Sequence, residues 1–306
     1  MAIPVGAFAN AFKLGIDTTM ESDTPVRVAV YVDESASPFI VTTVRDALVP
    51  ATTSALVRVS RLTEQPAVPK PDTDVVLVLS CGSDILEPAV RDLVVSGAPV
   101  CVVAESSVEA PFISVDTPVL GLVAATDAGH LTEALARWIL DRTEKGTAFA
   151  ANFAFMRDAA ANRIITQAAL ANMASGALIF IPGADFPVMA FTQAGMVLQL
   201  SSAYGLGLKP ERAYEIGAVL LAGLGLRGVS RLLCSRVPRV SFAIQALVAG
   251  FGTYGMGKAL AGAYERGIDY GPVNRAVSGA LAKVRAAVGA AGEARATDTD
   301  AAVREV

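Results

Sequence analysis

The sequence predicts an α/β domain built on a five-stranded, parallel-type sheet, followed by an apolar helical-hairpin domain. Short β-branched runs alternate with helical segments from residue 25 to about residue 145, which is the pattern of a parallel sheet flanked by helices. Charged residues then become sparse, and long uncharged stretches follow. The expected domains are residues 25–145 and 146–292. An N-terminal segment, 1–24, precedes them, and a polar tail, 293–306, is expected to be disordered.

The N-terminal segment carries Phe8, Phe12 and Ile16 at four-residue spacing, which can place them on one face of a short amphipathic helix. Two interpretations stay open for this face. It docks onto the protein's own core, or it contacts a membrane surface.

Five runs rich in valine and leucine are predicted as strands, at residues 26–32, 55–62, 74–80, 99–105 and 118–124. Helices are expected over 38–48, 85–95 and 130–142, and the last of them places Leu131, Leu135, Trp138 and Ile139 on one stripe. Residues 64–72, EQPAVPKPD, hold three prolines and are predicted to form an extended connector.

The composition excludes several classes of function. One histidine and three cysteines cannot build a zinc finger or a disulfide framework, and they leave Cys-His catalysis with a single base. A net charge of -4 and a pI of about 5.2 lack the basic excess of nucleic-acid binders. We therefore expect a non-enzymatic chain with no catalytic residue, no metal, no cofactor and no nucleic-acid partner.

Ligands of such sheets bind at the carboxyl ends of the strands, so the loop after the first strand is the place to look for a phosphate site. This loop begins at Asp33 and contains neither glycine nor lysine, which excludes the usual phosphate cradle. Asp33 and Glu34 resemble a pair of acids, but no second catalytic partner is identifiable. We interpret them as solvated loop residues or helix caps. His130 is expected at the surface, near a cap at Asp127, and Cys101 in the core.

The order of elements resembles the small Ras-like or Era-like GTPase domains. The residues at that family's nucleotide motifs differ here: Ile40 and Val41 in the phosphate loop, Glu105, Ser106 and Val108 at the guanine-reading motif, and residues 124–126 at the last motif. The resemblance implies a degenerate GTPase-like domain without nucleotide motifs. A generic flavodoxin-like sheet without such ancestry is the alternative.

The composition changes after Lys145. Residues 148–264 contain nine Lys or Arg and four Asp or Glu, and residues 164–184, 186–208 and 240–257 carry no charge. Such runs approach the roughly 20 residues that a helix needs to cross a bilayer. Their high alanine and glycine content also suits tightly packed helices of a soluble protein.

This half resembles a bacterial family catalogued as domain of unknown function family 697, over residues 160–267. The pattern is carried by Pro182, Asp185, Gln193, Met196, Tyr204, Gly205, Arg212, Pro238, Thr253, Gly257 and Gly267. The resemblance implies a membrane-associated helical domain of a kind often attached to GTPase domains. It supplies no reaction.

The same residues also have a physical interpretation. Pro182 should end one helix and Asp185 cap the next, giving a helical hairpin whose basic end faces the cytoplasm. Gln193 is expected to bond between helices, and the glycines of 250–262 to allow close packing. An arginine at Leu198 should release the chain from membranes, whereas Arg227 and Arg231 prevent 213–236 from spanning.

The sequence thus predicts a membrane-associated adaptor or scaffold that presents its α/β domain on the cytoplasmic face. Membrane lipids are the expected partners, together with a protein partner or further copies of the chain. The alternatives are a cytoplasmic, self-assembling binding module with buried apolar helices, and a divergent GTPase-like nucleotide binder.

Overall fold

The computed structural model describes residues 23–178, 185–207, 211–236, 241–271 and 275. The described residues up to Glu265 belong to one compact unit, and those from Arg266 onward belong to a second. The boundary predicted near residue 145 falls inside the first unit, in the turn between two helices. The predicted N-terminal amphipathic helix and the predicted tail, 293–306, lie outside the described residues.

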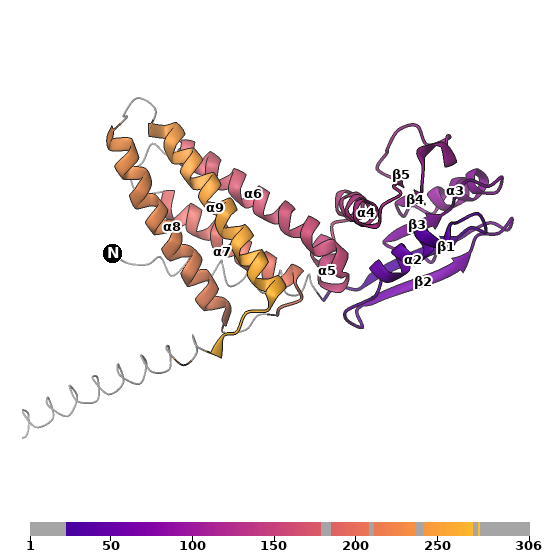
Figure 1. The fold of residues 1–306 in the computed structure, drawn as a ribbon, viewed down its shortest axis with the longest axis horizontal. Helices are drawn as coiled ribbons and strands as arrows, with labels where there is room; N and C mark the ends of the chain where they lie inside the picture. Colours follow the sequence, from indigo (N-terminus) through magenta and orange to yellow (C-terminus); the bar gives the residue numbers. More distant parts are fainter. Residues whose placement is uncertain (1–22, 179–184, 208–210, 237–240, 272–274, 276–306) are drawn as a thin grey trace, which may run out of the picture. The chain divides into compact units, whose positions relative to one another are not determined.

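A five-stranded, all-parallel sheet forms the first part of the fold (Figure 1). Its strands are β1 (Val26–Val32), β2 (Ala55–Arg61), β3 (Val75–Leu79), β4 (Val100–Ala104) and β5 (Leu120–Ala124). They lie in the order β2-β1-β3-β4-β5. The five predicted strands are confirmed. Every residue of β3 and β4 is buried, because these strands lie inside the sheet and both of its faces are covered.

Three helices flank the sheet: α2 (Pro38–Ala47), α3 (Leu86–Val95) and α4 (Ala128–Arg142). The predicted stripe of α4 is buried and packs with the same core as α2, whereas α3 packs against the opposite face. Ser37 caps α2 and Asp127 caps α4, each by accepting a bond from an amide three residues on. No helix joins β2 to β3, where Leu62 and Ala67 of the proline-rich connector are buried with the α3 core.

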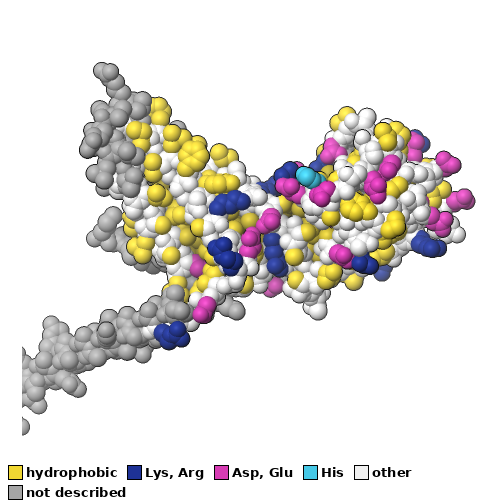
Figure 2. Space-filling view, viewed as in Figure 1, with side chains coloured by type: hydrophobic (Ala, Val, Ile, Leu, Met, Phe, Trp, Pro, Cys, Tyr) yellow, Lys and Arg dark blue, Asp and Glu magenta, His cyan; other side chains and the backbone are white. Residues whose placement is uncertain are grey.

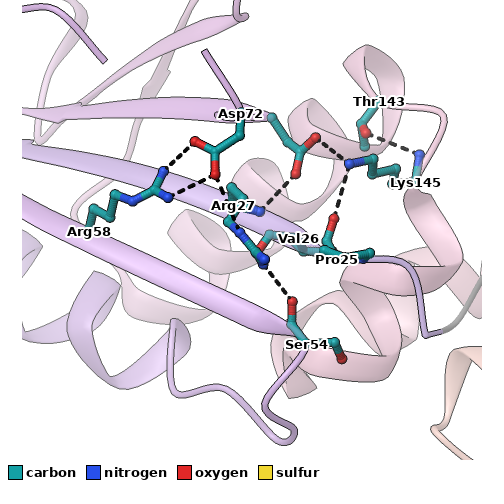
Figure 3. A network of polar contacts seen from close by, with 9 residues as sticks. Pro25, Val26, Arg27, Ser54, Arg58, Asp72, Thr143 and Lys145 are labelled. Carbon is teal, nitrogen blue, oxygen red and sulfur yellow. Dashed lines mark hydrogen bonds and ion pairs between the residues drawn. The ribbon is translucent and has the colours of Figure 1, made fainter. Parts of the chain in front are cut away.

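A network of polar contacts lies where β1 and β3 begin (Figure 3). The Asp74 carboxylate accepts bonds from the Arg27 backbone N–H, at 2.7 Å, and from Lys145 Nζ, at 2.6 Å. Beside it, Arg58 binds Asp72 with two bonds of 2.8 Å each. Lys145 directly precedes the next helix, so the network fixes the start of the helical part to the sheet.

The helical part comprises α5 (Gly146–Asn152), a short 3-10 turn, η2 (Ala154–Met156), α6 (Arg157–Leu178), α7 (Asp185–Ala203), α8 (Glu211–Arg236) and α9 (Ser241–Arg266). Helix α7 packs against α5, α6 and α8. Phe149, Phe153 and Met156 are fully buried in the core that also contains β1, β3, α2 and α4. Within the first unit, one core therefore continues from the sheet into these helices.

Glycines bring α6 and α9 together. A Cβ on Gly176 of α6 would lie 3.1 Å from the Ala246 Cα and the Gln245 carbonyl oxygen of α9. Added carbons at Gly250 and Gly257 would meet Met173 and Ile165 of α6. The prediction of close helix packing thus holds for Gly250 and Gly257, whereas a Cβ on Gly255 would meet nothing within 4 Å. Among the described residues, no helix combines the length and the apolar character needed to cross a membrane.

Candidate functional site

The first candidate site lies at the carboxyl edge of the sheet, between β1 and β3. The strand order turns at this point, because β2 lies to one side of β1 and the later strands lie to the other. In open α/β sheets, such a switch point is the usual place for a ligand. Asp33 directly follows β1, and Ser80 directly follows β3.

The Asp33 carboxylate is only 3% exposed and is held by three hydroxyl groups. Its Oδ2 accepts bonds from Ser80 and Ser83, at 2.6 Å each, and from Ser35, at 2.9 Å. Ser35 Oγ in turn accepts a bond of 3.1 Å from the backbone N–H of Cys81. We call these four residues, Asp33, Ser35, Ser80 and Ser83, the Asp33 cluster.

The hydroxyl donors of the Asp33 cluster all bond to the Asp33 carboxylate. Burial raises the pKa of the Asp33 carboxyl, but the bonds from Ser80, Ser83 and Ser35 outweigh burial, so its pKa lies below the ordinary value. Asp33 is therefore ionised at neutral pH. A phosphate group here would meet a negative charge, and it would find that these hydroxyls already donate to Asp33.

The interpretation of Asp33 as a solvated loop residue or helix cap was wrong, whereas Glu34 is exposed as expected. The sequence did hold a signal for the cluster. Asp33 and Ser35 follow one predicted strand, Ser80 ends another and Ser83 follows it, and the carboxyl ends of parallel strands meet at one edge. That signal becomes useful only when the two strands are known to be neighbours.

The GTPase resemblance would place base recognition in the loop after β4. A side chain of this loop takes up two of its backbone N–H donors. Glu109 accepts bonds from the backbone N–H groups of Glu105, at 2.9 Å, and Ser106, at 3.2 Å. Elsewhere, His130 is exposed and contacts its cap residue Asp127. Cys101 is buried, and burial raises the pKa of its thiol. The described part of the chain contains no group of side chains suited to a metal ion.

A second candidate site joins residues of the family pattern inside the helical part. Arg212, at the start of α8, donates to the Glu215 carboxylate, and both side chains are buried. Tyr264 of α9 donates to Glu215 and accepts a bond of 3.3 Å from Arg212. The rings of Tyr204 and Tyr264 lie 5.5 Å apart. These four residues form the helix polar cluster. Arg212, Glu215 and Tyr264 bond to one another, whereas the Tyr204 hydroxyl donates to Glu265 at 2.9 Å.

Two other residues of that pattern, Gly205 and Gln193, lie at a helix end and at a helix contact. Gly205 ends α7 with a φ of +69°, a conformation that favours glycine. Gln193 is buried where a Cβ on Gly223 would come within 2.8 Å of its Oε1. The hydrogen bond expected of Gln193 is not found among the described residues. Asn172 of α6 and Thr253 of α9 instead form a buried interhelical bond of 2.8 Å.

Three residues of the family pattern have side chains that are not described. Asp185 is the first residue of α7, but its side chain lies outside the described part, as do Pro182 and Pro238. The predicted cap at Asp185 therefore stays a prediction.

Comparisons with protein-family models, with curated proteins and with solved structures found no match for this chain. The two family resemblances therefore rest on the residues of the sequence.

Proposed function

We propose that the chain is a non-enzymatic, membrane-associated scaffold, in which α8 and α9 lie against a membrane surface and the α/β part stands on the cytoplasmic side. The observation that carries the proposal is the exposed apolar stripe on each of these two helices. Membrane lipid is the partner that fits this face best.

Helix α9 is apolar on both of its faces. Gly250, Thr253 and Gly257 lie on its buried face. Leu247, Phe251 and Tyr254 follow one another at spacings of four and three residues along an exposed side of the helix, where Phe251 is 67% exposed. A helix that is apolar all round is usually covered on every side. Its outer stripe is therefore expected to meet an apolar phase.

Helix α8 also has an exposed apolar side. It has no charged residue between Glu215 and Arg227, and Leu221, which is 69% exposed, and Leu224 lie on its outer side. Figure 2 shows hydrophobic and uncharged atoms over much of the helical part, whereas charged side chains gather over the sheet part. Covering one leucine or phenylalanine side chain fully is worth about 1.5 to 3 kcal/mol, so several together favour a lipid surface strongly.

The position of Lys258 also fits an interfacial helix. Lys258 follows Tyr254 by four residues, at the exposed end of the α9 stripe, where its Nζ donates to Asn162 Oδ1 of α6. Long basic side chains can lay their stems along an apolar surface while their charged ends reach the lipid headgroups. Such helices bind a bilayer without crossing it.

The Asp33 cluster supports a role other than nucleotide turnover. Its carboxylate lies at the usual ligand position of the fold and takes up the available hydroxyl donors. The α/β part then acts as a presented surface rather than as an enzyme.

Vesicle flotation tests the proposal. The purified full chain is mixed with vesicles of phosphatidylethanolamine and phosphatidylglycerol and centrifuged through a density gradient. The wild type and Val95→Lys, a control on exposed Val95 of α3, should float with the vesicles. The double variant Leu247→Lys, Phe251→Lys should stay at the bottom, because two charges enter the stripe. A wild type that does not float would overturn the proposal. If, in addition, the double variant breaks up an oligomer of the chain, the alternative of a self-assembling binding module replaces the membrane-associated scaffold.

A further inference from the structure

The two edge strands of the sheet, β2 and β5, differ in whether their outward backbone groups are hydrogen-bonded. In a parallel pair, alternate residues of a strand bond to one neighbour, and the residues between them point to the other side. Bonds from Val26 N to Ser54 O, and from Leu62 N to Val32 O, fix which residues of β2 serve β1. The backbone groups of residues 55, 57, 59 and 61 therefore point away from the sheet.

The edge at β5 is closed by its own turn. Thr117 N–H donates to Leu120 O at 2.8 Å, and Thr117 Oγ1 accepts from Leu120 N at 3.0 Å. Asp116 accepts a bond from Leu122 N at 3.2 Å. These are outward groups of the first half of β5, so the side chains and backbone of this turn block further strand pairing there.

The edge at β2 has no such closure among the described residues. None of them bonds to the outward backbone groups of Ala55, Val57, Val59 and Arg61. Val59 is 67% exposed, and Leu56 is exposed as well. The strand has seven residues and contains no proline. A long exposed edge with apolar side chains is a template for another strand. Figure 1 shows β2 at the margin of the sheet.

We propose that this edge pairs with β2 of a second copy of the chain, in antiparallel register about a two-fold axis at Arg58. The two sheets then continue into one. This inference is independent of the proposed membrane association, because it concerns the sheet and not the helices.

The sequence of β2 is self-complementary in this register. Val57 lies opposite Val59 of the other copy in a hydrogen-bonded pair, so the outward groups of both residues are satisfied. Pairs of β-branched side chains are favourable across strands. Closed two-fold dimers are also the commonest oligomers of soluble proteins.

The charge at the centre of the pairing is balanced. Arg58 would face Arg58 of the other copy, and like charges directly opposite each other are unfavourable. Each Arg58, however, is bound by both oxygens of its own Asp72 (Figure 3). Asp72 also lies 3.6 Å from Arg27 Nε, but its two bonds of 2.8 Å go to Arg58, so each Arg58 reaches the axis with its charge paired. This balance favours a second copy over an acidic peptide, which would compete with Asp72.

Substitutions at Val59 test the edge without disturbing the pairing with β1. The backbone N–H of Val59 points outward, so Val59→Pro removes a donor that β1 does not use. Val59→Lys keeps the backbone intact and adds a charge opposite Val57. Sedimentation of the full chain in mild detergent should show a wild-type dimer. Both variants should raise its dissociation constant at least about tenfold, and Val95→Lys should leave it unchanged.

Cross-linking tests the register. Cα atoms of a non-hydrogen-bonded antiparallel pair lie about 4.5 Å apart, which a disulfide can bridge. Arg58→Cys should therefore form a covalent dimer on mild oxidation. Ser60→Cys, whose opposite residue is Leu56, should give no more than the wild type. A monomeric wild type would overturn the proposal even if extended peptides bind the edge. So would a dimer that survives both Val59 variants.

Discussion

The Asp33 cluster offers the sharpest test of the site, through the replacements Asp33→Ala and Asp33→Asn. Alanine removes three hydrogen bonds to a charged acceptor, and the fully buried Ser80 loses its shortest bond, although it keeps its contacts with Ser35 Oγ and the Gly82 N–H. Such bonds are each worth about 1.5 to 3 kcal/mol and are not additive within a cluster, so we expect a loss of about 3 to 5 kcal/mol. Asparagine keeps one acceptor oxygen, and the hydroxyls can rotate to accept from its amide. We expect it to cost only about 1 to 2 kcal/mol.

Urea denaturation of the full chain in mild detergent measures both losses. Trp138, the single tryptophan, is buried in α4 against the core that the sheet shares, so its fluorescence reports unfolding of the α/β part. With a slope of about 2 kcal/mol per molar urea, the midpoint should fall by about 1.5 to 2.5 M for Asp33→Ala. Equal midpoints for alanine and wild type would refute the reasoning.

The pH dependence of stability gives an independent check. The pKa of Asp33 in the folded protein lies below its value in the unfolded chain, which is about 3.9. Its ionised form therefore stabilises the fold above that pH, and the stability is lost as the pH falls through the folded pKa. Between pH 5 and pH 3, the difference in stability between wild type and Asp33→Asn should shrink. A constant difference would mean that the carboxylate charge contributes nothing.

Three further predictions follow from the described contacts. First, calorimetry should detect no micromolar binding of GTP or ATP to the full chain, because Asp33 and Glu109 occupy the donors near both nucleotide positions; binding at that level would contradict the non-enzymatic assignment. Second, Gly176→Ala should lower the thermal stability of the helical part, since the new carbon meets the α9 backbone at 3.1 Å. Gly255→Ala meets nothing within 4 Å and should raise the free energy of unfolding by about 0.5 to 1 kcal/mol. Equal effects of the two variants would refute the close α6–α9 contact. Third, Tyr264→Phe should cost about 1 to 3 kcal/mol, because the buried Glu215 carboxylate loses a donor, and an unchanged unfolding midpoint would show that this bond does not matter.

The sheet part could be predicted closely because its signals are local. Valine-rich runs of five to seven residues predicted the type and place of β1, β3 and β4 within two residues. The Leu131 stripe of α4 is buried as its spacing predicted. The Asp33 cluster escaped prediction for a different reason. It joins residues 47 and 50 positions apart, and nothing in the sequence states that β3 lies beside β1.

The helical part shows where periodicity gives no information. In α7 and α9, apolar residues occupy all sides of the helix, so the sequence cannot say which side faces the core. Leu198 lies inside the uncharged run 186–208 and looks like a suitable place for a charge that would release the chain from membranes. It is buried in the structure, so Leu198→Arg would unfold the helices whatever the membrane does. Phe251 has the same apolar character but lies on the outer stripe of α9. A charge at Phe251 therefore tests the membrane contact, and a charge at Leu198 tests only the core.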